Sequence, residues 1–412
     1  MVHESQLNPS SEKILLRGAR QLITLQGSAG PRRGAALNEL SMIRDGALLL
    51  EGGKILEMGP SRRLENVIAA RGAREINAAG RVVLPGFVDS RTQPLIPETR
   101  PVPAAPDAPW RPLAELTALP SGRLHARAQH VLGRVARHGT TVSAVAFRAL
   151  SRPATLKMLR TFAGAEGRPL SVIPALYLAP LDPAGAQGSP EFDVEPLCNE
   201  WLPAIAHRNL ARFVEVDCDA FEPPAARRYL ECAGNLGFGL RVRAAAFTPA
   251  VRLALERRAA SMSLDDIAAS EIEALAGSHT TALLAPIARR AGSYLSARDL
   301  IDAGVAVALA SGFGLEHTST YNMQMVIALA CSEMGMSPAE AICAATINGA
   351  CALGCGNRCG SLQPGKCADL IMLNVEDYRE IPSQFGVNHV HMVVKNGAVV
   401  YQEGEVAGCS GR

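Results

Sequence analysis

The segment Val82-Val-Leu-Pro-Gly-Phe-Val-Asp89 is the first of eight short apolar runs in the middle of the chain. The other seven runs cover residues 140–147, 170–178, 213–217, 240–247, 261–264, 280–285 and 305–310. Helical segments separate them; Arg123 to His138, for example, carries apolar residues three and four positions apart and stops at Gly139. Strands that alternate with helices predict an α/β fold with a parallel (β/α)8 barrel, in which functional side chains stand at the C-terminal ends of the strands.

Both ends of the chain have the pattern of antiparallel β structure. Gly46 to Gly59 contains two apolar runs on either side of a Gly-Gly pair, and Val390 to Tyr401 contains two runs on either side of an Asn-Gly pair. Such pairs predict hairpin turns, because both turn residues need positive φ. Between the barrel runs and the C-terminal hairpin, Ser337-Pro-Ala-Glu340 forms a capping box that predicts a helix running towards Cys351.

The composition argues against several classes of protein. The chain has 412 residues, of which 48% are hydrophobic and 19% are charged, and its formal net charge is +2. This balance is not that of a protein that binds nucleic acid through bulk electrostatics, so we expect no nucleic-acid partner. No stretch approaches the roughly 18 consecutive apolar residues of a membrane span, and residues 1–10 lack an apolar signal core. We therefore expect a cytoplasmic protein with no membrane partner.

The cysteines favour no metal site of a standard type. Ten Cys occur without a single Cys-x-x-Cys pair, and the spacing of Cys351, Cys355, Cys359 and Cys367 matches no zinc ribbon. Such a set is typical of reduced cytosolic thiols.

Several segments resemble one known family. Val83-Leu-Pro-Gly-Phe-Val-Asp-Ser90 resembles the end of the first barrel strand in the amidohydrolase superfamily. Residues 304–310, 344–350 and 360–370 resemble its eighth strand, the helix that follows and the return to a small β-sandwich. Within the superfamily, the chain is most similar to imidazolonepropionases, which open the imidazolone ring in histidine degradation.

The resemblance implies both a fold and an activity. It implies a TIM-type barrel over residues 81–360 and a small β-sandwich domain built from both chain ends, residues 1–80 and 361–412. It also implies hydrolysis of a cyclic C–N bond with zinc as the cofactor.

The zinc-binding motif of the family is degenerate in this chain. The resemblance places the zinc ligands at four positions, which here are Arg91, Gln93, Arg243 and Gly312. A guanidinium has no lone pair for a metal and repels a cation, and glycine has no side chain to offer. We therefore predict no zinc or other cofactor, and the family's metal mechanism is not supported by the residues.

Residues that bind the substrate in the family are also changed, with one exception. Arg100 matches an Arg that grips the propionate carboxylate, and a guanidinium suits that task because it binds a carboxylate in bidentate geometry. Arg148 stands near the end of the second strand, where the family has a Tyr. Asp266 matches the catalytic His at the end of the sixth strand.

Arg91 and Arg243 are expected to project into the cavity that the metal would occupy. Two buried cations need counter-ions, and Asp265 or Asp266 is the nearest candidate. We expect a guanidinium–carboxylate cluster in place of the metal. It serves either as a structural plug or as a pocket in which Arg91, Arg100, Arg148 and Arg243 bind a small anion or carboxylate.

These observations leave three interpretations of function. The first is a non-catalytic or small-anion-binding homologue. The second is a still-active hydrolase of non-peptide C–N bonds that uses Asp266, Glu316 or His317 without the family's zinc site, or with a metal held elsewhere. The third is a structural partner subunit, with a homodimer as the expected assembly. His389 and His391 form a His-x-His pair that we interpret as structural, because it lies in the sandwich and far from the barrel mouth.

Overall fold

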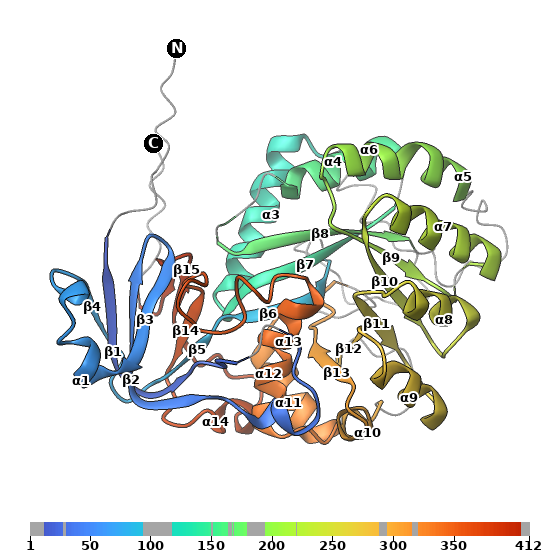
Figure 1. Ribbon diagram of the computed structural model, residues 1–412. Helices are drawn as coiled ribbons and strands as arrows, with labels where there is room; N and C mark the ends of the chain where they lie inside the picture. Colours follow the sequence, from blue (N-terminus) through green and yellow to red (C-terminus); the bar gives the residue numbers. More distant parts are fainter. Residues whose placement is uncertain are drawn as a thin grey trace, which may run out of the picture.

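The computed structural model describes residues 12–27, 30–93, 118–149, 151–163, 167, 169–178, 194–219, 221–287, 295–314 and 320–404. Its strands form two separate sheets of eight strands each. In Figure 1 the smaller β domain lies on the left and the barrel, with its outer helices, on the right. This arrangement confirms the predicted architecture of a TIM-type barrel with a small β domain.

The β domain takes its strands from both ends of the chain. Its strand order is β16-β15-β14-β5-β1-β2-β3, with β4 paired to β1. Both predicted hairpins are present, since β2 pairs with β3 and β15 with β16 in antiparallel fashion. The strands are β1 Ile14–Ile23, β2 Met42–Glu51, β3 Lys54–Pro60, β4 Arg74–Asn77, β5 Val82–Pro85, β14 Leu370–Leu373, β15 Val390–Lys395 and β16 Ala398–Gln402.

The second sheet is parallel and runs in sequence order from β6 to β13. Two backbone hydrogen bonds join its ends, from Gln93 N–H to the Phe313 carbonyl (2.6 Å) and from Gly312 N–H to the Arg91 carbonyl (3.1 Å). They close the sheet into a barrel at the C-terminal end of its first strand. The strands are β6 Phe87–Thr92, β7 Thr140–Arg148, β8 Ser171–Leu178, β9 Phe213–Asp217, β10 Gly239–Ala244, β11 Ser261–Leu264, β12 Thr281–Leu284 and β13 Ala306–Leu309.

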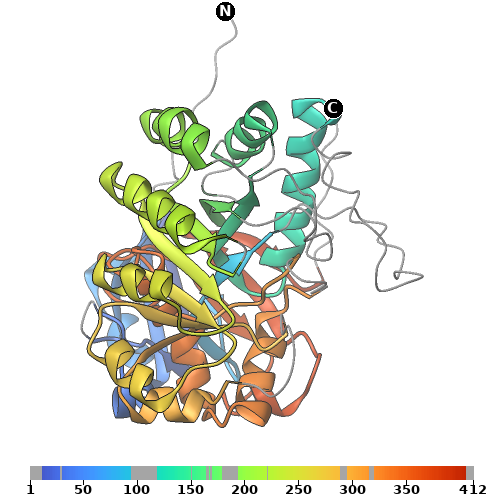
Figure 2. The ribbon, with the colours of Figure 1, turned by 90° about the vertical axis from the view of Figure 1, so that its right-hand side faces the viewer.

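Helices cover the outside of the barrel, as the two ribbon views show (Figures 1 and 2). The α-helices of the described residues are α1 Ser61–Leu64, α3 Ser121–Ala136, α4 Arg152–Ala163, α5 Val194–Pro196, α6 Leu202–His207, α7 Pro223–Asn235, α8 Pro249–Glu256, α9 Ala269–Ala276, α10 Ala297–Asp302, α11 Met323–Glu333, α12 Pro338–Ala344, α13 Ile347–Ala352 and α14 Glu380–Ser383. Short 3-10 turns occur at Gly34–Asn38 and Ile68–Ala70, and a π-helical turn at Leu197–Trp201.

The run Val82 to Asp89 is not one barrel strand, contrary to the sequence prediction. Its first half is β5 in the β domain, and β6 begins only at Phe87. Gly86 is the joint, and its N–H bonds to the Asp369 carbonyl at 3.1 Å. A Cβ at Gly86 would lie 2.2 Å from Cγ2 of Thr141. The close approach of the backbone to Thr141 therefore requires glycine at the point where the chain passes between the sheets.

Two further element boundaries differ from the prediction. The fifth barrel strand ends at Ala244 rather than Phe247, because the carboxylate of Asp219 accepts a hydrogen bond from the Ala245 N–H at 2.6 Å and ends the ladder. The helix that begins after Ser337 has the predicted capping box but stops at Ala344. A separate helix, α13, then starts at Ile347.

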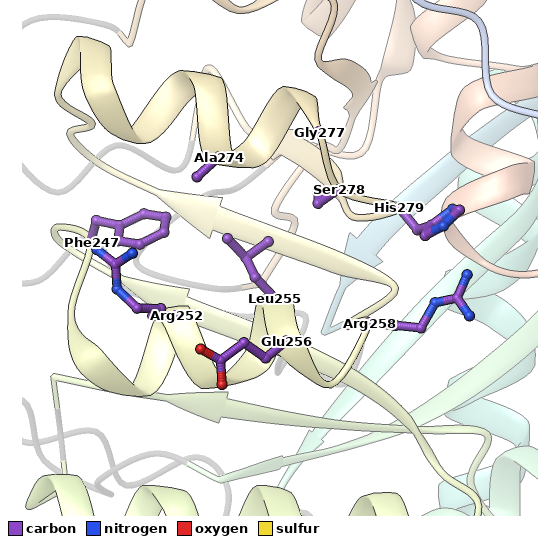
Figure 3. Close-up of a pocket in the computed structure, with 9 residues that line it drawn as sticks. All are labelled: Phe247, Arg252, Leu255, Glu256, Arg258, Ala274, Gly277, Ser278 and His279. Carbon is purple, nitrogen blue, oxygen red and sulfur yellow. The ribbon is translucent and has the colours of Figure 1, made fainter.

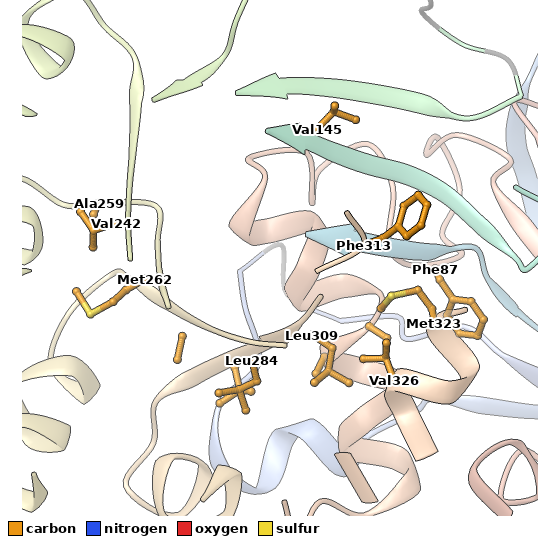
Figure 4. Packing of buried hydrophobic residues seen from close by; sticks show 14 of the residues in the cluster. Phe87, Val145, Val242, Ala259, Met262, Leu284, Leu309, Phe313, Met323 and Val326 are labelled. Atoms are coloured by element: carbon orange, nitrogen blue, oxygen red, sulfur yellow. The ribbon is translucent and has the colours of Figure 1, made fainter. Parts of the chain in front are cut away.

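The main apolar core lies between the barrel strands and the surrounding helices. Figure 4 shows Phe87 of β6 beside Met323 and Val326 of α11, and all three are fully buried. This packing fixes the first strand, and with it the side chains at that strand's C-terminal end.

Candidate functional site

The interior of the barrel changes from apolar to charged along its axis. At the N-terminal end, Val88, Val142, Ile173 and Phe213 pack against one another beneath α13. Towards the C-terminal ends of the strands, the buried side chains are instead acidic and basic. The charged half is the end at which TIM barrels carry their chemistry.

Strands β9 and β10 place opposite charges side by side. In the parallel register, Arg241 lies opposite Glu215 and Arg243 lies opposite Asp217. Alternate residues of a strand share one face, so all four side chains point into the barrel. The Arg241 Nε–Glu215 Oε2 distance is 3.4 Å, and the Arg243 Nη1–Asp217 Oδ2 distance is 3.8 Å. All four side chains are at most 3% exposed.

Arg91 joins this ladder from the first barrel strand. Both its Nε and its Nη2 lie 2.6 Å from Oε1 of Glu215, and the side chain is 3% exposed. The Arg91 guanidinium also lies 5.1 Å from the ring centroid of Tyr177 on β8, within cation–π range. Glu215 thus sits between two guanidinium groups, those of Arg91 and Arg241.

The charges of this network keep one another ionised. Burial alone would raise the pKa of Glu215, but the guanidinium groups of Arg91 and Arg241 outweigh burial and hold it below its usual value. Burial likewise opposes ionisation of Arg91, yet the Glu215 carboxylate raises its pKa above the ordinary value. Burial lowers the pKa of Arg241, and the nearby Arg91 cation acts in the same direction; the carboxylates of Glu215 and Asp89 only partly offset this.

Tyr177 and Asp217 extend the network on the other side. The Tyr177 hydroxyl donates to Oδ2 of Asp217 at 3.2 Å, and burial raises the pKa of that phenol. Arg148, at the end of β7, lies 5.6 Å from the Tyr177 ring centroid. The cation predicted at the second strand is therefore beside the network.

Asp89 forms a separate buried carboxylate near the barrel closure. It is 0% exposed and accepts hydrogen bonds from the Ser311 hydroxyl (2.5 Å) and the Ser311 N–H (2.9 Å). Burial raises the pKa of Asp89 to about 6 despite these bonds. Because Ser311 follows β13, this contact ties the last strand to the first.

The structure brings together only some of the residues predicted for the site. Arg91 and Arg243 both enter the barrel, and Asp265 lies 3.8 Å from Arg243, so one of the two predicted counter-ions is in place. Asp266 is not, because it is exposed and its carboxylate accepts from the N–H of Ile267 at 2.9 Å. Gln93 is buried at the barrel closure.

Three predicted residues, Arg100, Glu316 and His317, lie outside the described residues. Gly312 has φ +64°, and its N–H is used in closing the barrel.

Sequence reasoning missed Glu215, Asp217, Arg241 and Tyr177. The signal for the first three was present as Glu-x-Asp in one strand and Arg-x-Arg in the next. Acidic and basic residues two positions apart on neighbouring parallel strands must meet on one face if the register is unshifted. The register itself was not predictable from the two runs alone.

A hollow of about 380 Å³ lies on the outside of the barrel, away from this network. It is formed by residues of α8 and α9, by Phe247 just before α8, and by the segments that follow the two helices. Figure 3 shows Phe247 and Arg252 at one side and His279 at the other. The Arg252 guanidinium lies 5.3 Å from the Phe247 ring centroid. None of the predicted site residues lines this hollow.

Comparison with known proteins agrees with this architecture. Residues 233–400 match the model of the amidohydrolase family. The chain is 35% identical to the imidazolonepropionase of Solibacter usitatus, over 95% of this chain and 99% of that protein. The chain belongs to the amidohydrolase superfamily. It is also 34% identical to the imidazolonepropionase of Symbiobacterium thermophilum, over 95% of this chain and 98% of that protein.

A solved structure extends the likeness to the fold. This chain matches the solved structure of the E. coli guanine deaminase with a TM-score of 0.72. The match covers 95% of this chain and all of that chain, at 14% sequence identity. At this identity the match concerns the fold alone. Within the described ranges, the structure contains no helix long and apolar enough to cross a membrane.

The side chains at the positions where the superfamily resemblance implies zinc ligands are not suited to bind a zinc ion. The four matching positions carry two guanidinium groups, one amide and one glycine, and Arg91 already pairs with Glu215. Nor does any group of three His, Cys, Asp or Glu side chains in the described part of the chain suit a metal ion. A metal cation placed here would have to compete with the guanidinium groups of Arg91, Arg241 and Arg243 for the carboxylates of Glu215 and Asp217.

Proposed function

We propose that this amidohydrolase-superfamily chain is a non-catalytic homologue of the imidazolonepropionases, in which a buried ion-pair network fills the C-terminal half of the barrel. The observation that carries the proposal is the Arg91–Glu215 pair, with two N–O distances of 2.6 Å at a side-chain exposure of 2–3%. Arg91 stands where the resemblance implies a zinc-binding His. Its guanidinium supplies no lone pair, so a bound water could not be activated there by the superfamily's chemistry.

The balance of charges favours a structural plug made of paired side chains rather than an open pocket with excess positive charge. Four guanidinium groups (Arg91, Arg148, Arg241 and Arg243) and four carboxylates (Asp89, Glu215, Asp217 and Asp265) gather in and around this half of the barrel. Arg91 and Arg241 share Glu215, and Arg243 lies 3.8 Å from both Asp217 and Asp265. Buried charges of this kind are stable in a low-dielectric interior only when they are paired.

The test combines metal content with turnover. The full chain, purified after growth in zinc-supplemented medium, is analysed for transition metals and then incubated with imidazolone propionate while ring opening is followed by absorbance. The imidazolonepropionase of Solibacter usitatus, prepared in parallel, is the positive control. We expect far less than one metal per chain and no ring opening. Turnover by the metal-free protein would favour the alternative, a hydrolase that uses Asp266, Glu316 or His317.

A second candidate function, binding of a small carboxylate or inorganic anion, rests on one observation. Nη1 of Arg241 is buried and has no hydrogen-bond acceptor among the described residues. A small anion would satisfy this donor. Succinate, sulfate and chloride at matched ionic strength are the probes, and thermal unfolding is the readout. A rise in melting temperature with succinate or sulfate that Arg241→Met abolishes would support binding. Equal melting temperatures in all three salts would contradict it.

A further inference from the structure

A pair of cysteines lies at the closed end of the barrel, remote from the ion-pair network. The segment Gly354-Cys-Gly-Asn-Arg-Cys-Gly360 follows α13 and leads towards β14 of the small domain. Cys355 and Cys359 pack with the apolar residues at the N-terminal end of the barrel, and their Sγ atoms are 3.4 Å apart. These are two thiols in contact, with no role in the network described above.

The backbone holds the two thiols one tight turn apart. The Cys359 N–H donates to the Cys355 carbonyl at 3.0 Å. A disulfide needs an Sγ–Sγ distance of about 2.05 Å, so closing the bond shortens the present separation by about 1.4 Å. Gly354 has φ +62°, and Gly356 stands inside the turn. The absence of Cβ atoms at both positions lets the turn adjust.

The environment gives the two thiols different pKa values. Cys355 accepts a hydrogen bond from the Cys359 thiol, which lowers the pKa of Cys355 and raises the pKa of Cys359 well above its usual value. The positive charges of Arg358 and Arg212 act in the same direction on Cys355. Because the thiolate is the reactive form, Cys355 is suited to attack an oxidant and Cys359 to resolve the product.

The pair is buried but lies close to the surface. Cys355 is 1% and Cys359 5% exposed, while Gly354, Asn357 and Arg358 of the same turn are exposed. A small oxidant therefore needs only a local opening of this turn, not an opening of the barrel.

We propose that Cys355 and Cys359 form a reversible disulfide when the protein meets hydrogen peroxide. The Cys355 thiolate attacks one peroxide oxygen, and with one proton the products are a sulfenic acid and water. The Cys359 thiol then attacks the sulfenic sulfur, the S–S bond forms and a second water leaves. Two thiols are oxidised by two electrons, and the peroxide is reduced to two waters. The disulfide would constrain the segment that connects the barrel to the small domain. This proposal is independent of the proposed function.

Peptide mapping tests this directly, because Arg358 lies between the two cysteines. Trypsin cuts after Arg358, so Cys355 ends up on the peptide that terminates at Arg358 and Cys359 on the peptide Cys359–Lys366. The full chain is treated with hydrogen peroxide, alkylated in denaturant without reduction, and digested. We expect the two peptides to be recovered mostly as one cross-linked species, lighter by two hydrogen atoms than the two free peptides together. Dithiothreitol before alkylation should restore both.

Matched variants separate this pair from its neighbours. Cys351→Ser should leave the cross-link intact, whereas Cys359→Ser should remove it and leave Cys355 as a sulfenic acid that dimedone traps. Recovery of alkylated Cys359 from peroxide-treated wild-type protein would overturn the proposal, as would a cross-link to Cys351 or Cys367. The peptide that ends at Arg358 also contains Cys331, Cys343 and Cys351, so fragmentation of the cross-linked species is used to locate the bond. With that step the wild-type map decides the matter even if Cys359→Ser does not fold.

Discussion

Replacing Glu215 by Gln tests the buried network at its centre. The substitution keeps the shape of the side chain but removes the carboxylate that lies 2.6 Å from Arg91 and 3.4 Å from Arg241. Both guanidinium groups stay buried, so the variant carries uncompensated positive charge in the barrel. Removal of one partner from a buried pair typically costs about 3–5 kcal/mol, and we expect a loss of that size in the free energy of unfolding at pH 7. Urea denaturation followed by circular dichroism measures it.

The pH dependence of this loss has a defined sign. The pKa of Glu215 is lowered in the folded protein, so its stabilising contribution is complete above the unfolded value of about 4.3 and disappears as the pH falls through the folded value. The difference between wild type and Glu215→Gln should therefore be constant near neutrality and shrink in acid. Adding Arg91→Met to the variant should recover part of the loss, because one of the two uncompensated charges is then gone.

An exposed pair supplies the matched control. Glu200 pairs with Arg152 at 3.4 Å, with side-chain exposures of 60% and 47%. Glu200→Gln should change the free energy of unfolding by about 0–1 kcal/mol. If Glu215→Gln costs no more than Glu200→Gln, the network is not a buried, mutually dependent unit and the reasoning fails.

Three further substitutions test other buried contacts of the barrel and of the β domain. Asp89→Asn should stabilise the protein by about 1–3 kcal/mol at pH 8 and have little effect at pH 4, since a carboxyl with a pKa raised to about 6 opposes folding only when ionised; urea midpoints at the two pH values measure this. Gly86→Ala should destabilise by about 1–3 kcal/mol, because its Cβ would lie 2.2 Å from Thr141; a melting temperature equal to wild type would contradict that. Asp369→Asn should cost about 3–5 kcal/mol by leaving Lys395 buried without the carboxylate 2.5 Å away; chemical denaturation would show it.

Gly122→Ala is the control for the glycine substitution. A Cβ at Gly122 would meet no atom within 4 Å, and the residue lies in the first turn of α3. Alanine there should preserve or slightly raise stability.

The barrel was predictable from sequence because its strands are short apolar runs separated by helical periods. The eight predicted runs overlap the eight observed strands, and both hairpins formed where Gly-Gly and Asn-Gly pairs stand. The joint at Gly86 was missed although Pro85-Gly86 is a pair that marks turns, because the apolar residues on both sides of it were taken as one strand. The need for glycine there comes from Thr141, which is distant in sequence.

The site was predictable only in part for a related reason. The family resemblance identified Arg91 and Arg243 as cations inside the barrel, but their main partners depend on register. Glu215 and Asp217 become neighbours of Arg241 and Arg243 only because β9 and β10 pair without a shift. Asp265 and Asp266 were equally near in sequence, and backbone direction alone decides that one faces Arg243 while the other faces solvent.

The shared position of Glu215 between two guanidinium groups has a consequence for how this chain can change over generations. Exchanging Arg91 alone removes one of the two cations that hold Glu215 ionised, while exchanging Glu215 alone strands both cations in a dry interior. Each single step thus passes through a protein less stable than its starting point, although a combined replacement need not be. Single substitutions at these paired buried charges are therefore selected against because they destabilise the fold. Substitutions accumulate more readily on the outside of the barrel, and the buried charges are retained for stability whether or not a reaction depends on them.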